Sequence, residues 1–150
     1  MLPLGKCVTY HEACHLVHTQ NISQQPRALL QSIPVSQFVE LPEAAWCCGS
    51  AGIYNVVRTE DSMKFLNRKM DNLASTGADI VITSNPGCHL QLQYGIKQRG
   101  LTMEVRHPVS ILNKIIRSLE NILTFLLLAC LFLYYEIEYE IKKNKKGVKP

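Results

Sequence analysis

Two adjacent cysteines, Cys47 and Cys48, stand in the segment AWCCGSAG, which continues with Gly49 and Gly52. A disulfide between neighbouring cysteines closes a small, strained ring. Joint burial as apolar side chains is also unfavourable, because consecutive side chains of a strand point to opposite faces. We therefore infer that both thiolates bind one object. The two glycines would let backbone N–H groups approach the sulfur atoms closely.

The candidate ligands of such a site are four cysteines from three widely separated parts of the chain: Cys14, Cys47, Cys48 and Cys88. Four thiolates can form a closed zinc site, but the C-x2-C pairs typical of such sites are absent from this sequence. Adjacent residues also have difficulty in placing both sulfurs about 2.3 Å from one ion. A cluster with several irons relaxes this demand. The pattern favours an iron–sulfur cluster and leaves zinc as the alternative.

The remaining cysteines and the histidines are weaker candidates for metal ligands. We expect Cys7, within a strand, and Cys130, in an apolar segment, to be inert. His11 and His15 flank Cys14 and are expected to form hydrogen bonds near the site rather than to bind metal. His107 is a further candidate for a role at the site, since it ends a predicted strand.

The elements that must position these residues alternate along the chain. Runs rich in β-branched residues predict four strands, over 6–11, 36–42, 78–84 and 101–107. Apolar periodicity, with Thr59 as an N-cap and Gly77 as a stop for the clearest segment, predicts helices over 24–33, 60–76, 88–98 and 108–119. This alternation indicates an α/β fold with an open, mostly parallel sheet of about four strands flanked by helices.

The four candidate cysteines and His107 share one position relative to the predicted strands. Each lies at or just beyond the C-terminal end of a strand. In a parallel sheet these ends meet at one edge, which is where such folds bind ligands. We therefore expect the fold to gather Cys14, Cys47, Cys48 and Cys88 into one site.

The length and the charge of the chain limit the classes of protein to which it can belong. The 150 residues suit one domain, which we place over residues 1–112. This part is nearly neutral, with nine Lys/Arg and eight Asp/Glu, so the net charge of +4 does not describe a nucleic-acid-binding face. The N-terminal segment does not resemble a secretory signal. We expect a reducing, cytoplasmic location, in which clustered cysteines indicate metal binding or catalysis.

Residues 113–150 are expected to form an apolar and basic helical tail. The segment 121–135 contains fifteen uncharged residues, which as a helix would span roughly 22 Å. A bilayer core is about 30 Å thick and requires about 20 residues. Contact with the inner membrane is one interpretation of this segment, and a sequence that is not part of the evolved domain is the other.

Four segments carry a resemblance to a known family: TYHEACHL, ELPEAAWCCGSAGIYN, TGADIVITSNPGC and VRHPVSIL. Together they resemble the cysteine-rich CCG domain, and in particular the C-terminal domain of this type in the glycolate oxidase iron–sulfur subunit. They are also similar to lactate-utilisation proteins and to the cysteine-rich subunit of heterodisulfide reductase. Two departures stand out: Glu12-Ala13 replaces a common Asp-Pro, and Asn85 occupies the position of a cysteine in the fullest motif.

The resemblance implies a Rossmann-like fold and an electron carrier, of the 4Fe-4S type, bound by Cys14, Cys47, Cys48 and Cys88, with Gly49 and His107 beside it. It implies a flavin-containing 2-hydroxy-acid dehydrogenase subunit as partner. It also implies that further iron–sulfur domains are missing from this chain, which looks like the last third of a longer subunit and is not catalytic alone. Two alternatives stay open: a zinc-stabilised domain that docks a catalytic partner, and a thiol enzyme using Cys47 or Cys48.

Overall fold

The computed structural model of the chain describes residues 5–33 and 36–147. It divides into two compact units, Leu2–Leu112 and Asn113–Pro150. All the described strands and all the candidate site residues belong to the first unit.

A parallel sheet of four described strands forms the centre of the first unit: β1 (Lys6–His11), β2 (Ser36–Phe38), β3 (Ile80–Thr83) and β4 (Glu104–Arg106). The strand order is β2-β1-β3-β4, and every neighbouring pair is parallel. All of β3 is buried, as expected for an apolar, β-branched run in the middle of such a sheet. The predicted open, parallel α/β sheet of about four strands is therefore confirmed.

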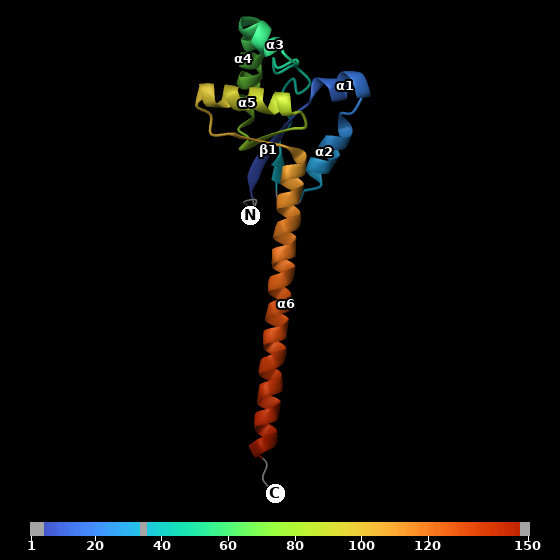
Figure 1. Ribbon diagram of the computed structural model, residues 1–150, viewed down its shortest axis with the longest axis vertical. Coiled ribbons are helices and arrows are strands. Elements are labelled where there is room, and N and C mark those ends of the chain that lie inside the picture. The colour runs from blue at the N-terminus through green and yellow to red at the C-terminus, as the bar shows by residue number, and fades with distance from the viewer. Residues whose placement is uncertain (1–4, 34–35, 148–150) are drawn as a thin grey trace. The chain divides into compact units, whose positions relative to one another are not determined.

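Helices connect the strands of this sheet: α1 (Cys14–Gln20), α2 (Gln24–Gln31), α3 (Tyr54–Val57), α4 (Thr59–Thr76) and α5 (Pro86–Arg99). The helices α1 and α2 lie on one face of the sheet and α4 with α5 on the other (Figure 1), as expected for this strand order with right-handed crossovers. The main core lies under α4 and α5, where Leu66, Met70, Val81 and Leu92 pack together with Cys48 and Cys88. The two cysteines are thus buried at one end of the hydrophobic core.

Some local predictions differ from the structure. The strand predicted over 36–42 ends at Phe38, because the chain turns away to form the segment that carries Cys47 and Cys48. Thr59 is the first residue of α4 rather than its cap, and its hydroxyl instead donates to carbonyl oxygens of the preceding helix, α3. Gly77 ends α4 in the left-handed conformation, as its position after the periodic segment predicts.

The last helix, α6 (Pro108–Gly147), continues without a break through the segment predicted to be a tail. Many of its apolar side chains between Ile116 and Leu131 are exposed, as is Cys130. None of the helices in the described part of the chain has the length and hydropathy required to cross a membrane.

Candidate metal centre

The carboxyl edge of the sheet carries the first group of candidate ligands. His11 is the last residue of β1, and Cys14 is the first residue of α1. Cys48 lies in the segment that follows β2, and Cys88 lies in the first turn of α5, directly after β3. The sheet topology therefore brings three separate connections to one place.

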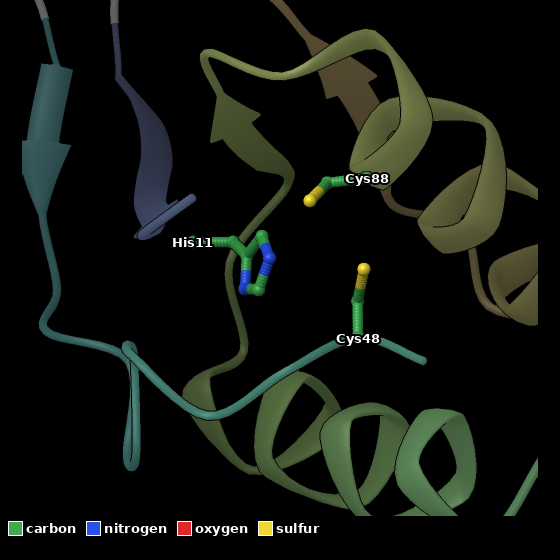
Figure 2. Close-up of side chains that lie close together, drawn as sticks. All are labelled: His11, Cys48 and Cys88. Atoms are coloured by element: carbon green, nitrogen blue, oxygen red, sulfur yellow. The ribbon is translucent and has the colours of Figure 1, made fainter. Parts of the chain in front are cut away.

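His11, Cys48 and Cys88 form the buried centre of this site. The sulfur atoms of the two cysteines and a ring nitrogen of His11 all lie within 4.8 Å of one another. Figure 2 shows the three side chains pointing into the same space from β1, from the segment after β2 and from α5. Thiol and imidazole groups at this spacing can bind a soft metal ion or an iron of a cluster.

Three of the four predicted cysteines, Cys47, Cys48 and Cys88, affect the pKa of one another. The neighbouring Cys48 thiol, together with burial, raises the pKa of Cys47. The Cys47 thiol lowers the pKa of Cys48, but the Cys88 thiol and burial raise it more, to about 12. A metal must therefore displace protons from these two thiols.

Cys88 differs from Cys47 and Cys48 in that its pKa is lowered. The neighbouring Cys48 thiol has the largest effect, and burial and the charges of Cys14 and Cys47 oppose it. The backbone N–H of Cys88 donates to Oδ1 of Asn85 over 3.0 Å. Asn85 is thereby the N-cap of α5 and fixes the helix turn from which Cys88 reaches the site.

Cys14 and Cys47 are half-buried and line an open apolar hollow together with Trp46 and Phe65. The two aromatic rings pack at 5.8 Å between centroids, and Arg68 stacks over Trp46. The site thus extends from the buried group of His11, Cys48 and Cys88 toward the surface on the side of Cys14 and Cys47. The structure places Cys14 at this more exposed side of the site.

Gly49 closes the turn after the two cysteines. Its φ of +89° lies in the region that favours glycine, and a Cβ atom there would collide with the carbonyl oxygen of Ser62 on α4. The N–H of Gly49 donates to the sulfur of Cys47 over 3.3 Å. Ser62 in turn donates to the carbonyl of Gly49 over 2.9 Å and accepts from Gln91 of α5 over 3.1 Å. The turn is therefore fixed to both helices.

A buried cation supports the segment that carries Cys47 and Cys48. Lys69 of α4 is 0% exposed, and its Nζ donates to the carbonyl oxygens of Glu43 and Ala44. Burial lowers the pKa of Lys69 to about 8, although the nearby thiols and Glu43 act in the opposite direction. Lys69 thus ties this segment to α4 and adds a positive charge behind the sulfur atoms.

An ion pair holds the start of α1. The buried carboxylate of Glu12 accepts hydrogen bonds from Arg27 and from Ser23. Burial alone would raise the pKa of Glu12, but these hydrogen bonds outweigh it and lower the pKa. Arg27 also binds Glu40 beyond β2. These contacts fix the chain two residues before Cys14.

His107 and Cys7 have hydrogen bonds of their own that involve the backbone. His107 accepts a hydrogen bond from the backbone N–H of Val109 at the start of α6 and lines a different hollow, beside β4, together with His89. Cys7 lies within β1, and its backbone N–H donates to Asp79 over 2.8 Å.

Sequence analysis missed the supporting residues Ser62, Lys69 and Arg27. Two of them could have been found from the sequence pattern, because Ser62 and Lys69 fall on the apolar face of α4, in line with Leu66 and Leu73. Polar residues within a buried helix face need partners, and these two hold the segment with the cysteines. Arg27 left no such signal.

The fold and the site define a parallel α/β domain that gathers thiols at the carboxyl edge of its sheet. Comparison with known proteins agrees. The model of the cysteine-rich domain family CCG matches residues 8–93, and the chain belongs to this family.

Three relatives illustrate the likeness. The chain is 48% identical over 105 residues to the probable glycolate oxidase iron-sulfur subunit of Bacillus subtilis, covering 70% of this chain and 24% of that protein. It is 35% identical over 101 residues to a subunit of the fumarate reductase (CoM/CoB) of Methanothermobacter marburgensis, covering 67% and 21%. It is 32% identical over 105 residues to lactate utilization protein A of Lysinibacillus sphaericus, covering 70% and 46%. The chain thus spans less than half the length of these relatives.

Proposed function

We propose that this chain is an iron–sulfur electron-transfer module of a 2-hydroxy-acid oxidase or dehydrogenase, with glycolate as the substrate of the whole assembly. The observations that support the proposal are the buried group of His11, Cys48 and Cys88, whose ligand atoms lie within 4.8 Å of one another, and the hollow that Cys14 and Cys47 line together. The name of the Bacillus subtilis relative supplies both the iron–sulfur group and glycolate.

We assign Cys14, Cys47, Cys48 and Cys88 as the ligands of a cluster of the 4Fe-4S type. When bound, an iron–sulfur cluster takes up and gives back one electron at a time. The protein side chains then have two tasks: thiolates hold the metal, and Lys69 offsets part of the negative charge. The N–H of Gly49 donates to one ligand sulfur.

We propose a flavin-containing dehydrogenase subunit as partner, with residues 1–112 as the electron-carrying domain in the cytoplasm. The half-buried thiols Cys14 and Cys47 mark the side from which the partner approaches. Because the chain covers 24% of the Bacillus subtilis relative, further iron–sulfur domains would complete the subunit. Residues 121–135 are the candidate for contact with a membrane.

A zinc-stabilised docking domain is the second candidate. It is favoured by the group of His11, Cys48 and Cys88, whose ligand atoms lie within 4.8 Å of one another and so suit a single ion. This function requires about one zinc per chain and no electron transfer.

Serine replacement of single cysteines tests the proposed ligands. Serine is a poor substitute for a soft thiolate, so replacement of Cys14, Cys47, Cys48 or Cys88 should lower the iron content or change the absorption spectrum after anaerobic reconstitution. The matched controls are Cys7→Ser, in the interior of β1, and Cys130→Ser, on α6, which should retain the iron content of the wild type. Equal iron content in all six variants would contradict the assignment.

A further inference from the structure

Three buried polar side chains lack hydrogen-bond partners in the described part of the chain: Thr9, His11 and Thr83. They share one face of the sheet, because Thr9 and His11 are two residues apart on β1 and Thr83 pairs with His11 in the register of β1 and β3. Both ring nitrogens of His11 are without partners, and the residue is 1% exposed. A buried polar group without a hydrogen bond destabilises the folded chain. We therefore expect a group that is bound at the site to form a hydrogen bond with a ring nitrogen of His11.

The position of His11 identifies where that partner binds. One ring nitrogen lies on the side of the sulfur atoms of Cys48 and Cys88 (Figure 2). An imidazole carries at least one N–H donor in either of its protonation states. An N–H donor of His11 at this place faces the sulfur atoms, on which the negative charge of a bound cluster would be concentrated.

We propose that His11 donates a hydrogen bond to the iron–sulfur cluster, at a ligand sulfur or a sulfide, and thereby raises the reduction potential of this site. The inference rests on the proposed function and deepens it. Four thiols already supply the ligands, which leaves the imidazole free to act as a donor. Hydrogen bonds to the sulfurs stabilise the more negative, reduced form and so raise its potential. The same bond satisfies one of the orphaned nitrogens.

The test compares His11→Leu with Thr9→Val in the full chain. Both variants remove an unpartnered buried polar group from the same face of β1 at similar volume. His11 has a ring nitrogen within 4.8 Å of the sulfur atoms of Cys48 and Cys88, whereas Thr9 is two residues further from the carboxyl end of β1. In the metal-free protein, the urea midpoint should not fall in either variant, because no hydrogen bond is lost. After reconstitution, both should hold the iron content of the wild type.

The reduction potential separates the two variants. His11→Leu should lower it by an amount that corresponds to about a tenfold change in the ratio of reduced to oxidised protein, roughly 59 mV for one electron. Thr9→Val should leave the potential unchanged, and His11→Gln, whose amide can still donate, should recover part of the shift. A weak nitrogen coupling in the pulsed EPR spectrum of the wild type should disappear in His11→Leu.

The contrary outcomes are distinct. An unchanged potential in His11→Leu with full iron content overturns the inference alone. A lower urea midpoint of metal-free His11→Leu also overturns the inference, because it would mean that the ring has a structural role. Loss of iron in His11→Leu overturns it as well, because it would make His11 a ligand. A wild-type chain that binds no iron would overturn the proposed function, and this inference with it.

Discussion

Replacement of Arg27 by methionine should remove a large part of the stability of the α/β unit. The Arg27 side chain is 14% exposed and that of Glu12 is 6% exposed, so water screens the pair very little. Methionine leaves the Glu12 carboxylate buried without its cation, which costs about 3–5 kcal/mol. Small domains have a total free energy of unfolding of about 5–15 kcal/mol. Urea unfolding of the metal-free chain at neutral pH measures the loss.

The double variant Arg27→Met with Glu12→Gln is the matched control. Removing the carboxylate removes the uncompensated charge, so the double variant should recover about 2 kcal/mol relative to Arg27→Met. The dependence on pH has a defined sign. The lowered pKa of Glu12 gives the wild type stability that is present above the ordinary pKa and lost as the pH falls below it. The deficit of Arg27→Met should therefore shrink on acidification.

Two results would refute this reasoning. One is a loss smaller than about 1 kcal/mol for Arg27→Met at neutral pH, which is the range of an exposed ion pair. The other is a deficit that stays constant from neutral to acidic pH.

Two further predictions concern the turn after the cysteines and the last helix. Gly49→Ala should destabilise the chain by about 3 kcal/mol, because the positive φ and a collision with Ser62 act together. Gly52→Ala should cost about 1 kcal/mol, because Gly52 also has a positive φ but has open space around it. Equal urea midpoints of the two variants would contradict this account. Deleting residues 121–150 should leave the cooperative unfolding of the sheet-containing unit unchanged. The deletion should also raise the solubility of the protein, since many of the apolar side chains from 122 to 131 are exposed. Loss of cooperative melting in the shortened chain would contradict this prediction.

The sheet and the location of the site could be predicted from the sequence because their signals are local. The run from Ile80 to Thr83 is apolar and β-branched, and the apolar face of α4 repeats with helical spacing. The parallel arrangement, inferred from the alternation of strands and helices, then predicted that the cysteines lie at one edge of the sheet without any knowledge of contacts. The helix α1 was missed, because its seven residues lack a side-chain cap and an acidic first turn.

The support of the site could not be predicted in the same way. The ion pair of Arg27 with Glu12 joins two surfaces whose approach depends on how α2 packs, which no local pattern encodes. The position of His11 at the end of a strand was visible, but its orphaned nitrogens depend on what the surrounding residues leave unpaired. The effect of Cys47, Cys48 and Cys88 on the pKa of one another likewise depends on the side-chain geometry of three residues.

The central claim is that this chain carries electrons on an iron–sulfur cluster. The most direct test is a reductive titration of the anaerobically reconstituted chain, followed by absorption and by analysis of iron, sulfide and zinc. We predict bound iron and sulfide in equal amounts and an absorption band that bleaches with about one electron per cluster and returns on oxidation. About one zinc per chain, without iron and without a reducible band, would contradict the claim and support the docking domain.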